Sequence, residues 1–486
     1  MNQSRRALLQ SAGFLLTAGA FPGRSIAFAL QSDPEAMTRL TGYLAQAKTR
    51  DLPPDVLTKA KYHVLDTIAA MVSGSQLKAG QAAIRFAETY GSSGGSTVVA
   101  TKIKAGTIEA ALANGLLAHS DETDDSHDAV RWHPGCAVVP AALAVGERFS
   151  ATGAHLLRAV ALGYDIGSRV MATMIAAGPQ THKSTHSIAG VWGAASASGS
   201  VASLSDQQMR WLLDYTAQQS SGIGVWSRDV DHIEKGFAFG GMPARSGVTS
   251  ALLVRAGWTG VDDVFTGEDN FLIANAPDTR KMPTELLVEQ LGQRYELMRT
   301  NIKKWSVGSP IQAPLDALDR MLKARPFDAD QVKDIVVTIE TTDRYVGTAG
   351  AAAVVNDREM PDVNIQYMLA VMMIDKTATF QAAHDKARMT DPAVLRQRAK
   401  VRLGSAGGRE PLLRVTLADG TELTEAAQPV RGTIRNPMTA EEILAKSRDL
   451  IVPVLGQAAS AKLVQTVLDL EHVGNVRSLG PLLQRN

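Results

Sequence analysis

Apolar residues at helical spacing occupy almost the whole stretch from residue 34 to 267, and this pattern restricts the fold more than any other feature. In the segment 56–72, for example, apolar residues recur at steps of three and four, and Gly74 follows the last of them. Such spacing predicts amphipathic helices. The segment 189–213 is rich in Ala, Ser and Gly, whose small side chains let helices approach closely. We therefore predict a large all-helical domain over residues 34–270.

The pattern changes after residue 275. The run Ile335–Ile339 is almost entirely β-branched, and Leu413–Leu423 has alternating apolar residues around an Asp-Gly pair, which is typical of a hairpin. These features predict a smaller α+β domain over residues 275–433. A helical pattern returns in residues 434–486, which we expect to pack back onto the first domain. The predicted fold class is mainly α.

Composition narrows the possible functions of the 486-residue chain. A hydrophobic content of 45% with 20% charged residues describes an ordinary globular protein. The net charge is +1, no dense basic face appears, and aromatic residues make up only 5%, so nucleic acid is not expected as a partner. Cys136 is the only cysteine in the sequence, which excludes an intramolecular disulfide.

The N-terminus has the pattern of a twin-arginine export signal. Arg5 and Arg6 precede a moderately apolar stretch at 12–20, and Ala27-Phe28-Ala29 offers small residues at the spacing that a signal peptidase needs. The apolar stretch is too short to span a bilayer. We predict a signal peptide over residues 1–29, a periplasmic or secreted location, and no membrane partner after export.

The segment from His119 to Pro134 concentrates acid/base groups just before an apolar helical pattern. Like charges raise each other's pKa values and resist desolvation, so such a cluster is found mainly where proton transfer or ligand binding requires it. The alternative is a solvated acidic loop. The segment contains the carboxylates Asp121, Glu122, Asp124, Asp125 and Asp128, and the histidines His119, His127 and His133.

Two further zones add candidate groups. His182 and His186 precede a helix start with several glycines, and Lys235 and Arg245 flank a glycine-rich turn. Basic side chains and backbone N–H groups in such a setting suit an acidic substrate. No phosphate-binding loop or nucleophile elbow appears.

A metal site is the alternative use of the first cluster. The side chains that could bind a metal there are His119, Asp124, His127 and His133. Because no fixed helical ligand spacing such as HExxH occurs, acid/base chemistry without a metal is favoured.

These residues occur within ordered motifs that resemble the MmgE/PrpD family, which includes 2-methylcitrate dehydratase, cis-aconitate decarboxylase and iminodisuccinate epimerase. The resemblance runs from about residue 36 to the C-terminus. The motifs are VLDTIAAMVSG at 64–74, HSDETDDSH at 119–127 with HPG at 133–135 and PAALAVGE at 140–147, GVWGAASASG at 190–199, KGFAFGGMPARSGV at 235–248, AGWTGVDDVFTG at 256–267, IQYMLAVMMIDK at 365–376 and RNPMTAEEILAK at 435–446.

The resemblance implies a large helical domain with a small α+β domain closing over it, a homodimer, and no cofactor or metal. It implies a lyase similar to 2-methylcitrate dehydratase, which removes a proton α to a carboxylate of a small polycarboxylate and expels a β-hydroxyl. The residues expected to be catalytic are Asp124, Asp125, His133, His186 and Lys235. Those expected to bind substrate are Glu122, Ser126, Arg245 and Tyr367. His182 competes with His186 for its position.

Two alternatives stay open from the sequence. An epimerase, isomerase or decarboxylase acting on a related di- or tricarboxylate would use a similar carbanion. A non-catalytic periplasmic polycarboxylate-binding protein is the other possibility, because Lys304–Ser309 replaces a turn that contains proline and cysteine in the family. The retained histidines, lysine and carboxylates favour an enzyme.

Overall fold

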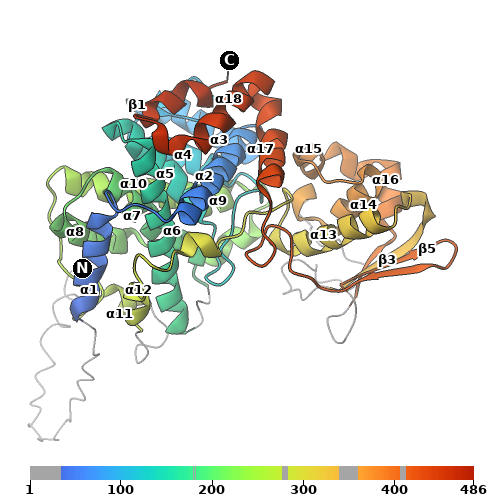
Figure 1. Cartoon of the computed structure of the whole chain (residues 1–486), viewed down its shortest axis with the longest axis horizontal. Helices are drawn as coiled ribbons and strands as arrows, with labels where there is room; N and C mark the ends of the chain where they lie inside the picture. Colours follow the sequence, from blue (N-terminus) through green and yellow to red (C-terminus); the bar gives the residue numbers. More distant parts are fainter. Residues whose placement is uncertain are drawn as a thin grey trace, which may run out of the picture. The chain divides into compact units, whose positions relative to one another are not determined.

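The computed structural model describes residues 34–178, 180, 182–275, 283–338, 360–404 and 412–485 (Figure 1). The predicted signal peptide lies outside these residues. The structure is 62% helical with a small mixed sheet, so the predicted mainly α class is confirmed. No helix in the described ranges is long and apolar enough to cross a membrane.

Helices from the first two thirds of the chain pack around one buried apolar cluster, which runs from α1 to Ile302 and also takes in the C-terminal helices α17 and α18. These helices are α1 (Pro34–Gln46), α2 (Pro54–Gly74), α3 (Lys78–Tyr90), α4 (Thr107–Ala118), α5 (Pro134–Phe149), α6 (Gly153–Ala176), α7 (Thr185–Val201), α8 (Asp206–Gln219), α9 (Ile233–Gly236), α10 (Met242–Arg255), α11 (Phe271–Asn275), α12 (Glu285–Val288), α17 (Ala440–Leu455) and α18 (Gln457–Leu468).

A second apolar cluster lies between Trp305 and Leu417. Its elements are α13 (Ser309–Ala324), β3 (Val332–Thr338), α14 (Ile365–Asp375), α15 (Phe380–His384), α16 (Pro392–Arg398), β4 (Val401–Gly404), β5 (Leu413–Leu417) and β6 (Glu422–Glu425). Both clusters belong to one unit, Ser32–Asn486. The predicted domain boundaries stay a prediction.

The mixed sheet has the strand order β4-β3-β5-β6. β3 pairs parallel with β4 and antiparallel with β5, and β5 pairs antiparallel with β6. The β5–β6 turn is the hairpin that the sequence predicts, and Gly420 there has a φ of 86°, a conformation that favours glycine. Alternate residues of β5 are buried because only one face of this strand meets the apolar cluster.

The helical part is not all-helical, which corrects the prediction for residues 34–270. It contains a short antiparallel pair, β1 (Ser93–Thr97) and β2 (Lys104–Ala105). The β1 sequence SGGST has no apolar alternation, so the pattern that normally indicates a strand is missing.

Small residues let the central helices pack closely around the future site. α7 is buried from Ser187 to Val201 and contacts α5, α6 and α10. A Cβ on Gly240 would overlap the carbonyl oxygen of Gly115, so α4 and the π-helical segment Phe237–Gly241 lie against each other with no side chain between them. This segment joins α9 to α10, so the predicted glycine-rich turn is helical in the structure.

Candidate active site

The acidic segment connects α4 to α5 as an irregular but buried turn. Every residue from His119 to His127 is buried, so the alternative of a solvated acidic loop is wrong. Pro134 occupies the first turn of α5, where its fixed φ and missing N–H suit a helix start. Buried charges need partners, and the partners of each carboxylate define the site.

Asp124 joins two histidines. Nδ1 of His119 lies 3.0 Å from both Asp124 oxygens, and Nδ1 of His133 lies 3.0 Å from Oδ1. A carboxylate only accepts hydrogen bonds, so each Nδ1 carries a proton and Nε2 of neutral His133 keeps its lone pair. Burial opposes ionisation of Asp124, but the two histidines hold its pKa well below its usual range.

Asp125 lies outside the pocket. Its Oδ2 accepts hydrogen bonds from Nδ1 of His63 (2.7 Å) and the hydroxyl of Tyr164 (2.6 Å), and its Oδ1 accepts one from the backbone N–H of Gly135 (2.8 Å). These bonds fix the first turn of α5, which follows His133. These contacts hold Asp125 away from the cavity lining, and its predicted catalytic role stays a prediction.

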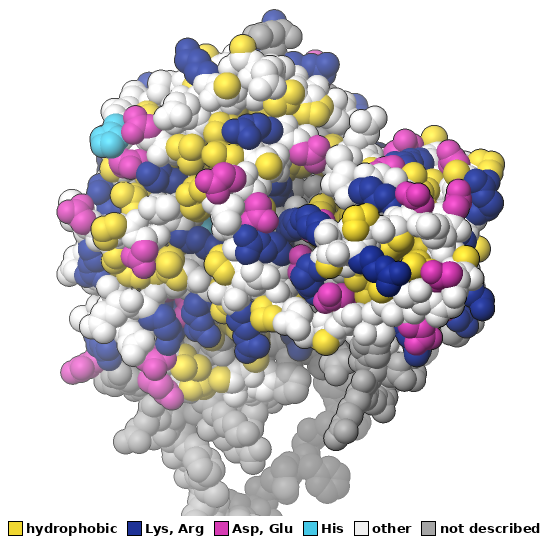
Figure 2. Space-filling model, turned by 45° about the vertical axis from the view of Figure 1, so that its right-hand side comes forward, with side chains coloured by type: hydrophobic (Ala, Val, Ile, Leu, Met, Phe, Trp, Pro, Cys, Tyr) yellow, Lys and Arg dark blue, Asp and Glu magenta, His cyan; other side chains and the backbone are white. Residues whose placement is uncertain are grey.

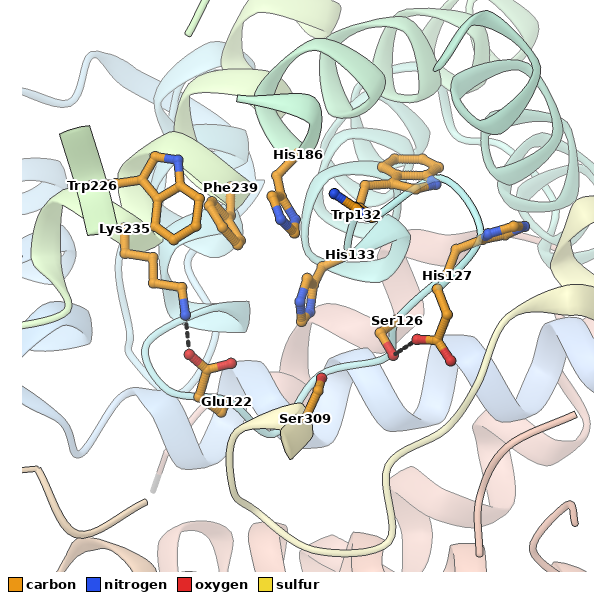
Figure 3. A pocket seen from close by; sticks show the side chains of 12 residues that line it. Glu122, Ser126, His127, Trp132, His133, His186, Trp226, Lys235, Phe239 and Ser309 are labelled. Carbon is orange, nitrogen blue, oxygen red and sulfur yellow. Dashed lines mark hydrogen bonds and ion pairs between the residues drawn. The ribbon is translucent and has the colours of Figure 1, made fainter. Parts of the chain in front are cut away.

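Glu122 contacts two lysines, one of which, Lys235, is shown beside it in Figure 3. Its Oε1 is ion-paired with Lys235, and Nζ of Lys303 lies 3.7 Å from Oε2 and donates a hydrogen bond to the Glu122 carbonyl oxygen at 2.7 Å. All three side chains are at most 10% exposed. Burial opposes ionisation of Glu122, but the two ammonium groups keep its pKa well below the usual range. The cluster therefore carries one excess positive charge.

Backbone pairing brings Lys303 to the site. Ser126 and Asn301 form an antiparallel bridge, with N–H to oxygen distances of 3.0 and 2.8 Å. This bridge aligns the chain around Lys303 with the acidic segment. Lys235 is held differently: its backbone N–H donates to Asp229 at 2.9 Å, and its ammonium group lies 5.3 Å from the Phe239 ring.

His186, in the first turn of α7, stacks on Phe239 with ring centroids 3.8 Å apart. Burial, together with the charge of Lys235 and the neighbouring His133, holds the pKa of His186 well below its usual range, so this imidazole is neutral at pH 7. His182 lies before the helix, is exposed, and has a φ of 68°. His186 therefore reaches the pocket and His182 does not.

These groups surround a cavity of about 220 Å³, shown in Figure 3. Six of the nine predicted site residues are placed at or directly behind its wall: Glu122, Ser126, His133, His186 and Lys235 line it, and Asp124 holds His133. Ser309, at the start of α13, also lines the cavity. The altered turn at 304–309 thus contributes to the site.

Two predicted substrate-binding residues do not line this cavity. Arg245 lies on α10 and is partly buried away from the lining. Tyr367 is fully buried in the second apolar cluster, where its hydroxyl donates to the carbonyl oxygen of Ala382 at 3.0 Å. Burial raises the pKa of Tyr367 to about 12, which suits a structural hydroxyl. Lys303 contacts Glu122 but does not line this cavity either, and the binding roles expected for Arg245 and Tyr367 stay predictions.

Sequence reasoning missed Lys303, Trp226 and Phe239 as parts of the site. The only signal for Phe239 was its place in the glycine-rich turn, and nothing local marks Lys303. A second cavity of about 710 Å³ shares Arg131, His186 and Trp226 with the first, and also contains His182. Its position makes it the approach to the inner pocket.

The metal alternative loses support from the contacts. His127 is separated from the other three candidates, because its Nε2 lies 3.1 Å from Glu296. His119, Asp124 and His133 do lie within 4.8 Å of one another, as do His119, Glu122 and His232. However, Asp124 already receives two N–H donors and Glu122 two ammonium groups. These contacts favour acid/base chemistry.

Comparisons with known proteins agree with this arrangement. The family model described as the MmgE/PrpD N-terminal domain matches residues 38–281, and the one described as the MmgE/PrpD C-terminal domain matches residues 305–471. Similar proteins include cis-aconitate decarboxylase of Aspergillus terreus (strain NIH 2624 / FGSC A1156), 23% identical over 90% of this chain and 93% of the relative. The human cis-aconitate decarboxylase is 25% identical over 90% and 92%. A cis-aconitate decarboxylase-like protein of Aspergillus oryzae, oryM, is 27% identical over 63% and 66%. The chain belongs to the MmgE/PrpD family.

Proposed function

We propose that this protein is a lyase that removes CO2 from a small unsaturated polycarboxylate. The observation that carries the proposal is the buried ion pair of Lys235 and Glu122, which lines one cavity together with His133 and His186, while Lys303 also contacts Glu122. The names of its relatives support decarboxylation over the dehydration expected from the sequence, and make cis-aconitate the first substrate to test.

Substrate binding would depend on cations. Lys and Arg side chains gather across the middle of the face shown in Figure 2, and Arg131 lies where the outer cavity meets the inner one. Basic clefts attract anions and raise their local concentration. A substrate carboxylate can replace Glu122 at one donor of Lys235 or Lys303, because each ammonium group has three.

The positive charges of the site favour decarboxylation. The bond between carbon and the departing carboxylate breaks, CO2 leaves, and the electron pair remains on the substrate, where the neighbouring unsaturated carboxylate delocalises it. Lys235 and Lys303 stabilise this additional negative charge in a site with little water. A proton is then delivered to carbon, either by the ammonium group of Lys235 or by His133 once its Nε2 has taken up a proton.

Dehydration is the second candidate, and one contact favours it. The hydrogen bond from His133 to Asp124 leaves the Nε2 lone pair free to act as a base. Decarboxylation needs no base, whereas removal of a proton α to a carboxylate does. The two reactions use the same cations and differ in the first step.

Deuterated water separates the candidates. The purified protein would be incubated in it with cis-aconitate, citrate, 2-methylcitrate and iminodisuccinate, and products would be followed by NMR. Decarboxylation releases CO2 and places one deuterium at one end of the allylic unit that shared the electron pair, dehydration gives an alkene without CO2, and epimerisation returns deuterated substrate. Binding without any of these outcomes would contradict the enzyme proposal and favour the non-catalytic alternative.

A further inference from the structure

We propose that a third, smaller cavity beside the acidic segment holds a proton relay between solvent and the catalytic pocket, in which His232 and Asp362 pass on the proton. The inference rests on the proposed function, because each decarboxylation replaces a carbon–carbon bond with a carbon–hydrogen bond and so consumes one proton. That proton must reach a buried site from water.

The relay cavity has a volume of about 90 Å³. His232 and Asp362 are at most 4% exposed and line it together with Asp121 and His384. Lys78, Asp231 and Lys386 are the exposed charged residues of its lining, and Lys78 is ion-paired with Asp231 at 2.7 Å. Each water occupies about 30 Å³, so the cavity has room for about three waters in a chain.

Three buried polar atoms on this lining have no hydrogen-bond partner among the described residues. They are Nε2 of His232, Oδ2 of Asp362 and Nε2 of His384, and the last of these lies 3.1 Å from Asp121. Buried polar side-chain atoms in proteins are nearly always satisfied by protein or by ordered water. The cavity supplies the space for such water, and water that bridges an imidazole and a carboxyl group provides a path along which a proton can move.

The inner end of the path reaches the catalytic pocket. One side-chain atom each of His232, His119 and Glu122 lie within 4.8 Å of one another, a separation that a single water can bridge. Glu122 holds the ammonium group of Lys235, and His119 shares Asp124 with His133. A proton delivered to His232 is therefore close to Lys235 and His133, the two proton donors of the pocket.

The pKa values of the ionisable groups along this cavity favour protons on the groups farther from the catalytic pocket. Burial, with the charge of Lys235, holds the pKa of His232 well below its usual value, so this imidazole is neutral and can accept a proton. Burial raises the pKa of Asp362 to about 7. Burial opposes charge on His384, but its contact with Asp121 at 3.1 Å and the nearby Asp362 raise its pKa to about 9.

The relay step balances without a further reactant. The pocket donor gives its proton to the carbanion and receives one from His232, which takes one through water from Asp362. Asp362 is then reprotonated by solvent. His384 stays charged beside Asp121 and limits the negative charge of the cavity when Asp362 is ionised.

The test compares Asp362→Asn, Asp362→Ala and His232→Asn with His472→Asn, an exposed histidine far along the chain from the site. Loss of an acid/base step costs about 10²- to 10⁴-fold. We expect Asp362→Asn to lower kcat by at least about tenfold at unchanged KM and to raise the solvent isotope effect on kcat. Formate added to Asp362→Ala should restore turnover, because it fits the vacated space and its carboxylate can take up a proton and pass it on.

An unchanged kcat in both Asp362→Asn and His232→Asn overturns the relay. So does a lower kcat that neither responds to formate nor shows a larger isotope effect, because that result indicates a positioning role. Thermal unfolding identifies a variant that fails to fold, in which case the other variant decides. Wild-type protein that turns over none of the acids overturns the proposed function, and the relay with it.

Discussion

Asp124 accepts hydrogen bonds from two imidazoles, and this arrangement decides which nitrogen of His133 faces the pocket. A carboxylate requires Nδ1 to carry the proton, so the Nε2 lone pair points toward substrate. His119 on the other side of Asp124 is fully buried and is held in the same way. The chemistry of the pocket therefore depends on a carboxylate that does not itself line it.

Replacing Asp124 with Asn tests this dependence. The amide would retain the shape but could donate as well as accept, so the tautomer of His133 would no longer be fixed. We expect kcat to fall by about 10²- to 10⁴-fold, with KM much less affected. Asp469→Asn is the matched control, because Asp469 makes a 2.7 Å contact with His472 at the surface. Equal activities of the two variants would contradict the role of Asp124.

The ion pair between Lys235 and Glu122 makes a prediction about stability. Lys235→Met leaves a buried carboxylate with only Lys303, and breaking a buried pair costs about 3–5 kcal/mol in free energy of unfolding. Adding Glu122→Gln should recover part of this loss while activity stays absent. Urea unfolding of both variants measures the effect.

Lys61→Met provides the comparison for that measurement. Lys61 is ion-paired with Glu471 at 2.8 Å, but both side chains are more exposed, at 16% and 21%. Exposed pairs contribute about 0–1 kcal/mol. Equal losses in the free energy of unfolding for Lys235→Met and Lys61→Met would contradict a larger contribution from the buried pair.

At the scale of elements, the close crossing of α4 and the π-helical segment Phe237–Gly241 holds Lys235 and Phe239 at the pocket. Gly240→Ala should lower the free energy of unfolding by about 1–3 kcal/mol, because the added methyl group meets the Gly115 carbonyl oxygen. It should also lower activity, since Phe239 is the neighbouring residue. Thermal unfolding checks the first effect.

Gly474→Ala is the control for the added methyl group, because a Cβ there meets nothing within 4 Å. A stability loss of the same size in both variants would mean that the crossing is not tightly packed at Gly240.

Elements with a strong local pattern were predictable. Helical spacing at 56–72 gives α2, and the Asp-Gly hairpin gives β5 and β6. The β1–β2 pair was missed because its sequence, rich in Ser and Gly, has no strand pattern and its pairing depends on tertiary contacts.

The site was predictable where its residues are close in sequence. The segment 119–134 supplies Glu122 and His133 together, and the two other zones supply His186 and Lys235. Lys303 was not predictable, because the bridge between Ser126 and Asn301 that brings it there joins residues far apart in the chain. Tyr367 shows the opposite case, since it was expected to bind substrate and the structure buries it in the second apolar cluster.

At the scale of the whole molecule, polar contacts join the two apolar clusters near the pocket. Lys303 contacts Glu122, and His384 of α15 contacts Asp121 at 3.1 Å. The acidic segment is therefore held by contacts both from Lys303 and from α15. Export through the twin-arginine signal and assembly into a homodimer stay predictions of the sequence.

His384 predicts how stability varies with pH. Its folded pKa of about 9 exceeds the ordinary 6.5, so its contribution is fully present below about pH 6.5 and is lost as pH rises through 9. The shift corresponds to a stabilisation on the order of 3 kcal/mol. Urea unfolding should show this decline in wild type and a flatter profile in His384→Gln.

His472→Gln serves as the control for the pH profile, because its side chain is 73% exposed and solvent weakens its pair with Asp469. A wild-type profile that stays flat between about pH 7 and 9 would contradict the charged state of His384.

The reaction proposed for this pocket is cleavage of a carbon–carbon bond to a carboxylate. The most direct measurement is proton-decoupled 13C NMR of the products formed from 13C-labelled cis-aconitate in deuterated water, with Lys235→Met in parallel. We expect 13CO2 from the wild type, one deuterium at one end of the allylic unit of the product, and neither with the variant. Unchanged substrate with the wild type, or equal CO2 release by the variant, would contradict it.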